Sequence, residues 1–331
     1  MNPKVKSITS RKLVQILEEK SKKGIDLAKR MMLEEKIKSD IIRHALEYYV
    51  SNWEILTHPA PFAIAYEAVG GDPDKMAEAQ AAVVMLSAAL DIHDDIIDKS
   101  ETKHGKQTLT GKYGQDIALL LGNAFFVNGF MLLDHSASKL RPEKIQEIFH
   151  ITKKGLFEVG DAHALEFRFR QEMHANAEEY MQILKMKAVT TQMSMQLGAM
   201  LGGGTNEEME ALTRYGRILG TLAALREEFI DIFETQELNQ RLQNECLPIP
   251  ILYALEDSNS KKIEEILSKK KIRKDNGEDL LRLISQSRRV KALKKEMMVM
   301  IEDAHNLTYE IENATSRSLL DALVASMVEN L

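Results

Sequence analysis

Cysteine and proline are scarce in this sequence, and positive charge is not in excess. The single cysteine, Cys246, excludes an internal disulfide and agrees with a reducing compartment, so we expect a cytoplasmic location. Only 7 prolines and 17 glycines interrupt the 331 residues, and a chain rich in Ala, Leu, Met, Glu and Lys favours helices. The net charge of -6 lacks the basic excess typical of nucleic-acid binding, so no nucleic-acid partner is expected.

Long uninterrupted apolar runs are also missing. Residues 1–30 are polar and charged, without the apolar core of a signal peptide. The longest apolar stretch, residues 117–133, is about the minimum length of a membrane span, but Asn123 and Asn128 interrupt it. We therefore expect a buried helix there. The basic run LSKKKIRK near residue 270 allows at most peripheral contact with an anionic membrane.

Apolar residues recur at helical spacing through most of the chain. Helices are predicted over residues 11–50 (two helices), 74–98, 115–135, 142–172, 177–201, 206–236 and 249–257. The charged segment 258–331 keeps an amphipathic pattern, and no alternating pattern of useful length predicts a strand. The sequence therefore predicts an all-α fold in one domain over residues 1–331, with a core of about 40–257 and a charged helical extension over 258–331.

The helix predicted over residues 74–98 ends on the sequence DDIID, residues 94–98, here called the first acidic run. At about 3.6 residues per turn, Asp94 and Asp98 lie on one face of the helix. Carboxylates at the end of a buried helix are costly without a compensating positive charge. Mg²⁺ takes such oxygen ligands together with substrate phosphates. These residues alone leave two interpretations open, a magnesium site and a solvated acidic helix end.

The surroundings of this run resemble the trans-isoprenyl diphosphate synthase family, the polyprenyl synthetases. LDIHDDIIDKS contains the family's DDxxD motif, preceded by His93, and the likeness extends from about residue 55 to 255. Gly70-Gly71-Asp72 and Leu247-Pro248 match further family positions in the same order. The resemblance implies a helical bundle around a central cavity, up to three Mg²⁺ ions, an allylic prenyl diphosphate substrate and a homodimer.

The resemblance also implies a second acidic motif on a later helix. It falls on residues 227–231 in LREEFIDIF, here called the second acidic run, and Glu227 and Asp231 share a helix face. An exposed acidic helix is the alternative interpretation. The resemblance implies metal contacts for Asp94, Asp95, Asp98, Glu227, Glu228 and Asp231, and catalytic roles for the same residues except Glu228.

Substrate contacts follow from the resemblance as well. Lys103 and Lys187 are expected to bind the diphosphate, and His58 stands where it could replace a family arginine. The prenyl tail is expected to lie along Met85, Leu86, Ala89 and Leu90, with Phe125 from the next helix facing the same cavity. Ala89 is small where short-chain members often have an aromatic residue, which implies a tail of C15 to C20 or longer. Core packing is the alternative for all these apolar residues.

Basic residues that the family uses to hold isopentenyl diphosphate are missing here. The family segment GGKRxRP corresponds to WEILTHP, residues 53–59, which contains no Lys or Arg. The family Arg-Arg-Gly appears as Lys103-His104-Gly105, and the lysine before Leu-Pro is replaced. Because Arg and Lys are the usual partners of phosphate, a second diphosphate would be held weakly.

The sequence therefore favours an enzyme that ionises one allylic prenyl diphosphate of C15 to C20 or longer and cyclises or transfers the cation. Such a reaction resembles that of the class I terpene synthases. Two alternatives stay open. The chain could be a non-catalytic or regulatory subunit that forms a heteromer with an active synthase. It could also be an elongating polyprenyl or geranylgeranyl diphosphate synthase with a non-standard isopentenyl diphosphate site.

Overall fold

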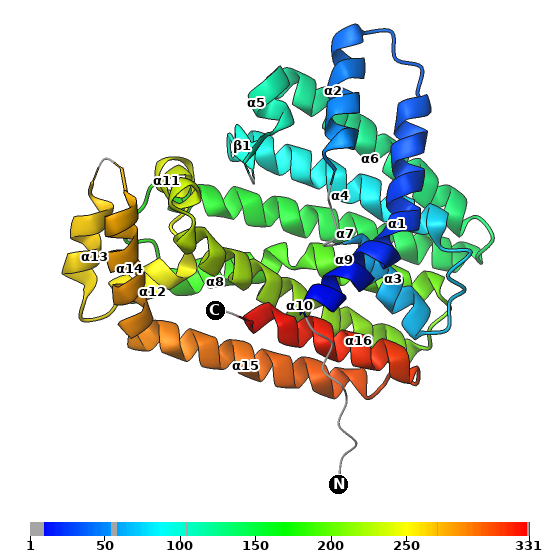
Figure 1. Cartoon of the computed structure of the whole chain (residues 1–331). Helices are drawn as coiled ribbons and strands as arrows, with labels where there is room; N and C mark the ends of the chain where they lie inside the picture. Colours follow the sequence, from blue (N-terminus) through cyan, green and yellow to red (C-terminus); the bar gives the residue numbers. More distant parts are fainter. Residues whose placement is uncertain (1–9, 54–57, 104, 270, 330) are drawn as a thin grey trace. The chain divides into compact units, whose positions relative to one another are not determined.

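The computed structural model describes residues 10–53, 58–103, 105–269, 271–329 and 331. Within these ranges the chain is helical apart from one two-stranded hairpin, so the all-α prediction is confirmed (Figure 1). The chain divides into two compact units. Unit 1 comprises Met1–Lys153, Met193–Thr213 and Glu310–Leu319, and unit 2 comprises Lys154–Gln192, Arg214–Tyr309 and Leu320–Leu331. The single-domain prediction stays a prediction.

Unit 1 contains the N-terminal helices and the hairpin. Its elements are α1 (Ser10–Glu34), α2 (Asp40–Ser51), α3 (Pro59–Ala68), α4 (Ala77–Ile97), β1 (Thr102–Lys103), β2 (Lys106–Gln107), α5 (Leu109–Tyr113) and α6 (Gln115–Ala137). Four further helices run from one unit into the other along the chain. They are α7 (Pro142–Glu166), α9 (Val189–Leu201), α10 (Asn206–Phe233) and α16 (Ala314–Ala325).

Helix α4 is the central helix of unit 1 and carries the first acidic run. Its sequence is rich in Ala and contains neither Gly nor Pro, which favours a long helix, and most of its length is buried on every side. Gln80 on α4 is fully buried, where its side chain bonds to the backbone of Lys20 and Gly24 on α1 and of Pro59 on α3. The helix ends before Lys99, whose φ of +54° cannot continue it.

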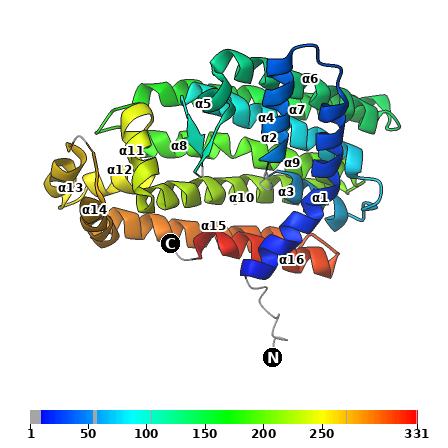
Figure 2. The same ribbon diagram turned by 45° about the horizontal axis from the view of Figure 1, so that its top comes forward.

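Helix α4 packs most extensively against α6, and Figures 1 and 2 both draw the two side by side. Glycines on α6 permit the close approach. A Cβ atom at Gly122 would lie 2.7 Å from Nε2 of His93, and one at Gly129 would lie 2.9 Å from Cγ of Leu86. The imidazole of His93, which precedes the first acidic run, therefore packs closely on the backbone of α6.

Helix α6 is long and apolar enough, by length and composition alone, to cross a membrane. One face packs on α4 through Leu121, Phe125 and other fully buried residues. The opposite face leaves Leu120, Val127 and Met131 exposed by 58%, 58% and 67%. The prediction of a buried helix is therefore correct for one face only.

Unit 2 is built around a short apolar helix, α12 (Ile249–Leu255), which packs against four neighbours. The elements that lie wholly in this unit are the 3₁₀ turns Phe167–Phe169 and Ser326–Val328, α8 (Ala177–Lys187), α11 (Thr235–Asn244), α12, α13 (Ser260–Leu267), α14 (Lys274–Gln286) and α15 (Arg288–Thr308). Asn176 caps α8 by accepting the N–H groups of Glu178 and Glu179. Helix α12 brings α8, α13, α14 and α15 together.

The predicted helices are present, with differences at four places. Helix α3 was not predicted, because Pro59 and Pro61 suggest a break, but a proline in the first turn of a helix is well tolerated. The segment between the helices predicted over 74–98 and 115–135 contains the hairpin and α5, which are too short for a pattern of hydrophobicity to reveal. The helix predicted over 177–201 is interrupted between Lys187 and Val189. The sequence does not predict α11, because TQELNQRLQN is polar and Leu238 is its only buried apolar residue.

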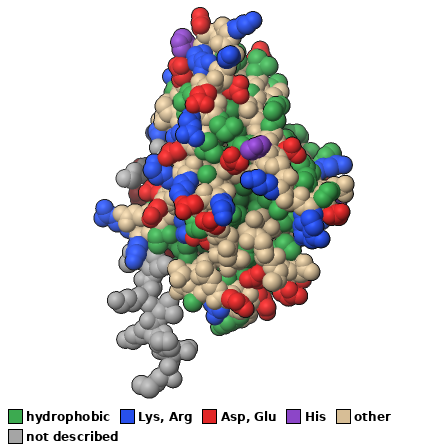
Figure 3. Space-filling view, turned by 90° about the vertical axis from the view of Figure 1, so that its right-hand side faces the viewer, with side chains coloured by type: hydrophobic (Ala, Val, Ile, Leu, Met, Phe, Trp, Pro, Cys, Tyr) green, Lys and Arg blue, Asp and Glu red, His purple; other side chains and the backbone are tan. Residues whose placement is uncertain are grey.

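Charges of both signs are interspersed on the surface. On the face drawn in Figure 3, Lys and Arg side chains alternate with Asp and Glu, and hydrophobic side chains lie among them. This distribution agrees with the modest net charge of -6.

Candidate active site

The first acidic run occupies the C-terminal turn of α4. Asp94 and Asp98 are partly buried, whereas Asp95 is only 8% exposed. Asp98 is the C-cap residue, and its N–H donates to the carbonyl of Asp94. The carbonyl end of a helix carries partial negative charge. Both the side chains and the backbone therefore make this position attractive to a cation.

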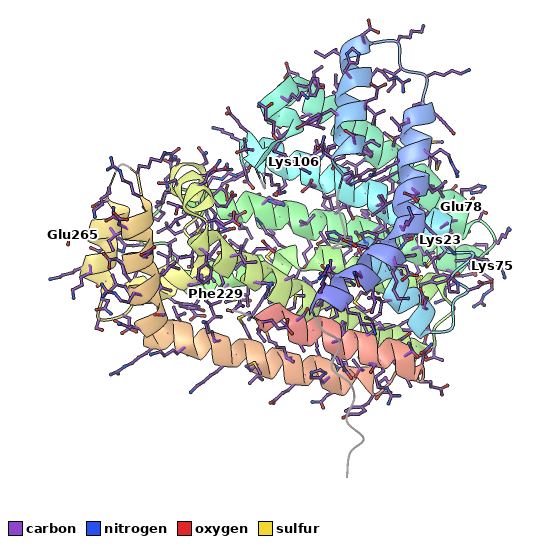
Figure 4. All side chains as sticks on the ribbon, viewed as in Figure 1. Lys23, Lys75, Glu78, Lys106, Phe229 and Glu265 are labelled. Carbon is purple, nitrogen blue, oxygen red and sulfur yellow. The ribbon has the colours of Figure 1, made fainter. Side chains whose placement is uncertain are left out.

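The hairpin places one lysine against this run. Nζ of Lys103 on β1 lies 2.7 Å from Oδ1 of Asp91 and 3.6 Å from Oδ1 of Asp95. Lys106 on β2, labelled in Figure 4, marks the position of the hairpin. Burial raises the pKa of Asp95 to about 7, with Lys103 opposing and Asp91 and Asp94 adding to the rise. Lys103 therefore favours the charged form of Asp95, whereas burial favours the protonated form.

The residues of the first acidic run fit a magnesium ion as a partial ligand set. Within the described residues, no group of three or more His, Cys, Asp and Glu side chains is arranged to hold a metal alone. Magnesium is often bound through one or two carboxylates, with waters and substrate phosphates completing its shell. Asp94 and Asp98, both partly buried at the end of α4, could supply such carboxylates.

The second acidic run lies near the end of α10, where Phe229, labelled in Figure 4, marks its position. Glu227 is exposed, but Glu228 is only 4% exposed. Oε1 of Glu228 accepts Nη2 of Arg241 at 2.8 Å, and its Oε2 accepts the N–H of Ile249 at 2.7 Å. Oδ2 of Asp231 accepts Nη1 of Arg241 at 2.6 Å. The metal role predicted for Glu228 and Asp231 stays a prediction, and a metal there would compete with Arg241.

Sequence reasoning missed Arg241. It lies on α11, ten residues beyond Asp231, and it is only 7% exposed. The available signal was a lone arginine in a polar helix beside an acidic run. Spacing along the chain could not show that it turns back to α10.

Lys187 lies in a buried ion pair in the same unit. Its Nζ is 2.5 Å from Oε2 of Glu166, which is only 7% exposed. Burial opposes the charged form of Glu166, yet Lys187 and Arg241 bring the pKa of its carboxyl below the usual value. The Tyr180 hydroxyl lies 3.2 Å from Glu166 and 3.1 Å from Glu228, so it links Lys187 to the second acidic run. The predicted diphosphate contact of Lys187 stays a prediction.

The predicted tail-lining residues lie in the core of unit 1. Met85, Ala89 and Phe125 are fully buried, and Leu90 is partly buried. The centroid of the Phe125 ring lies 5.4 Å from the ring centroids of both Tyr49 and Trp53, and both contacts are edge-on. The Tyr49 hydroxyl donates to the carbonyl of Ala88, next to Ala89. In this structure Met85, Ala89 and Phe125 belong to the packed core of unit 1. Contact of the predicted residues with a prenyl tail stays a prediction.

His58 is the N-cap residue that precedes α3, and it is partly buried. Burial lowers its pKa to about 4, with Asp91 opposing the shift. At neutral pH the imidazole is therefore uncharged, which makes it a weaker phosphate ligand than the arginine it was predicted to replace. Residues 54–57 of the WEILTHP segment and His104 lie outside the described residues.

Comparison with known proteins decides the family. The polyprenyl synthetase family model matches residues 39–284. This chain belongs to the polyprenyl synthetase family. It is therefore an enzyme of the prenyltransferase class in isoprenoid biosynthesis, as the sequence predicted.

Curated relatives agree with this family assignment. A short chain isoprenyl diphosphate synthase of Methanothermobacter thermautotrophicus is 25% identical over 238 residues, which are 70% of this chain and 72% of that protein. Geranylgeranyl pyrophosphate synthase 12, chloroplastic, of Arabidopsis thaliana is 30% identical over 255 residues, which are 72% of this chain and 68% of that protein.

Solved structures of two archaeal synthases establish the fold. Geranylgeranyl pyrophosphate synthetase from Geoglobus acetivorans has a TM-score of 0.82 and 21% identity, covering 95% of this chain and 99% of that one. The Pyrococcus horikoshii geranylgeranyl pyrophosphate synthetase has a TM-score of 0.81 and 21% identity, covering 97% of this chain and 99% of that one. This polyprenyl synthetase thus has the all-α fold of its family. It retains three aspartates in its first acidic run and has two glutamates in its second.

Proposed function

We propose that this polyprenyl synthetase elongates an allylic prenyl diphosphate with isopentenyl diphosphate. The observation that carries the proposal is its similarity, over about 70% of both chains, to proteins named short chain isoprenyl and geranylgeranyl diphosphate synthases. This similarity favours elongation over the cyclising reaction that the sequence favoured. In an elongation the allylic C–O bond breaks, a new C–C bond forms, and pyrophosphate and one proton are released.

Charge separation is the main barrier to breaking the allylic C–O bond. Magnesium, when bound at Asp94 and Asp98, would neutralise the departing diphosphate. Lys103 already lies beside the run, and its ammonium group has three donors, so it can hold Asp91 and still donate to a phosphate oxygen. The apolar residues of α4 before the run would exclude water from the cation.

A second candidate function is ionisation of one prenyl diphosphate without isopentenyl diphosphate. The observation that favours it is the absence of Lys and Arg from WEILTHP, together with the uncharged state of His58. Both features weaken the expected grip on a second diphosphate.

A product assay on the purified full-length chain separates the two functions. Geranyl, farnesyl or geranylgeranyl diphosphate is supplied with Mg²⁺, with and without isopentenyl diphosphate, and the products are analysed by mass spectrometry. Elongation predicts longer diphosphates only when isopentenyl diphosphate is present. A hydrocarbon or alcohol formed without it would establish the second function and refute the first.

Two variants test the site within the same assay. Asp94→Asn should lower turnover by at least a hundredfold, since one electrostatic contact to the leaving group is typically worth about 10²–10³ in rate. Asp116→Asn removes one exposed acidic charge at the start of α6 and serves as the matched control. Equal turnover by both variants would contradict the assignment of the first acidic run.

We also propose that the chain forms a homodimer through the exposed face of α6. Leu120, Val127 and Met131 lie on one side of this helix and are all more than half exposed. Exposed apolar side chains in a row are typical of a surface that another protein covers. The family resemblance supports a second copy of this chain as that partner.

A further inference from the structure

We propose that Arg241 is the resident cation of the second acidic run and stands where the family resemblance implies a metal ion. Its guanidinium forms ion pairs with two carboxylates of the run, those of Glu228 and Asp231. Nη1 donates to Oδ2 of Asp231 at 2.6 Å, and Nη2 donates to Oε1 of Glu228 at 2.8 Å. One protein side chain thus holds both acids.

The remaining contacts of Arg241 fix it in this position. Nε donates to the carbonyl of Cys246 at 3.1 Å, and Nη2 also donates to the Tyr180 hydroxyl at 2.9 Å. The Glu245 carboxylate lies 3.5 Å from Nε. The side chain is 8% exposed, so its charge is well removed from water. A buried guanidinium with so many partners is not displaced cheaply, because it would lose charged hydrogen bonds without regaining hydration.

Glu228 is a poor magnesium ligand in this arrangement. Its Oε1 accepts from Arg241 and Tyr180, and its Oε2 accepts from the backbone N–H of Ile249. Magnesium requires near-octahedral oxygen geometry and keeps most of its water. An ion at Glu228 would have to bind beside these three hydrogen bonds and approach a fixed positive charge. The donor set therefore does not fit a metal.

A resident guanidinium differs from a metal in its response to solution conditions. Arginine keeps its proton throughout the physiological range, and it does not exchange with the solvent. Arg241 therefore offsets one of the two negative charges of Glu228 and Asp231 at any magnesium concentration, and it bridges the two carboxylates. It follows that metal ions bind through the first acidic run and that fewer ions bind than the three implied by the family.

The first test is made without any metal. In EDTA, Asp231→Asn removes one ion pair from Arg241 and should lower Tm by about 5 °C, as expected for a largely buried charge pair in a protein of this size. Asp116→Asn removes an exposed carboxylate from the first turn of α6 and should lower Tm far less, because a surface charge at a helix N-terminus adds little stability. If Asp231 were instead an empty metal ligand, removing its charge would relieve its repulsion with the other carboxylates of the run. An unchanged or raised Tm would therefore overturn the proposal.

The second test counts bound metal. Manganese stands in for magnesium, and electron paramagnetic resonance measures bound Mn²⁺ per chain in the presence of inorganic pyrophosphate. We expect Asp231→Asn to bind as many ions as the wild type, whereas Asp94→Asn binds fewer. The loss of one ion in folded Asp231→Asn would overturn the proposal.

An arginine variant gives an independent check. Arg241→Met should either gain one Mn²⁺ at the vacated run or fail to fold, as expected for a buried residue that compensates two carboxylates. A folded Arg241→Met with an unchanged ion count and an unchanged Tm would overturn the proposal. None of these measurements depends on turnover. The inference rests on the proposed function only for pyrophosphate binding at the first run, so failure of elongation in the product assay leaves the Tm test intact.

Discussion

Replacing Phe125 by alanine tests the core of unit 1 and the predicted tail site together. The side chain is fully buried on α6, and its ring meets Tyr49 and Trp53 at 5.4 Å each. Alanine would remove the ring from both edge-on contacts and leave a cavity in the core cluster that also contains Ala89 of α4. If a prenyl tail lies there, the cavity should accept a longer tail.

The size of the effect follows from the burial. Truncation of a fully buried phenylalanine to alanine costs about 3–5 kcal/mol of unfolding free energy, and the cost depends on how far the cavity collapses. Phe125 also forms two aromatic pairs, and each such pair contributes about 0.5–1.5 kcal/mol beyond the burial of its apolar area. Both pairs are lost in the alanine variant. The rings of Tyr49 and Trp53 are too large to move far into the space. We therefore expect a loss of about 4 kcal/mol.

Trp53 makes the measurement direct. It is the only tryptophan in the chain and lies against Phe125, so its fluorescence reports the unfolding of this region in urea. Phe62→Ala is the matched control, because Phe62 is equally buried in unit 1 but lies on α3 and stacks on Tyr66. Both variants should lose stability, while only Phe125→Ala should lengthen the product.

Two outcomes would contradict this reasoning. A loss of less than about 1 kcal/mol, with unchanged Trp53 emission, would mean that Phe125 does not pack as described. An equal shift of product length in Phe62→Ala would mean that lost stability, not the space added at Phe125, changes the chain length.

Further predictions concern pH, thiol reactivity and assembly. Burial raises the pKa of Asp95 to about 7, so between its ordinary value of 3.8 and about 7 the folded, metal-free protein holds a proton that the unfolded chain has released. Its stability should therefore fall as the pH rises through this window, and Asp95→Asn, which cannot titrate, should remove that part of the slope of Tm against pH in EDTA. A slope unchanged in this variant would refute the assignment. Cys246 is fully buried, and burial raises the pKa of its thiol. Iodoacetamide should thus leave the native protein unmodified at neutral pH and alkylate it fully in denaturant, as intact-mass spectrometry can measure. Rapid alkylation of the native protein would contradict the complete burial of this residue. Val127→Asp with Met131→Asp should convert a dimer to a monomer in sedimentation experiments, whereas a dimer that survives the double change would exclude the α6 face as the contact.

The sequence by itself determined the class of fold and most helices. In α4 the reason is local, because alanine-rich sequence without Gly or Pro favours a long helix whatever its neighbours are. The first acidic run could be placed on one face of a helix end for the same reason, since periodicity along a single element decides which residues share a face. The order and spacing of motifs then indicated the family, which the family model confirmed.

Only the tertiary structure decided how the charged residues are partnered. Lys103 faces Asp91 because a short hairpin turns it back onto α4, and Lys187 faces Glu166 because α8 packs beside the end of α7. Arg241 pairs with Glu228 and Asp231 from α11. This helix is polar and has no apolar stripe from which it could be predicted. Hydrophobic periodicity describes the face of one helix, whereas an ion pair depends on the relative position of two elements. The physical consequence is that the sequence could identify the acids of this enzyme but not the cations that hold them.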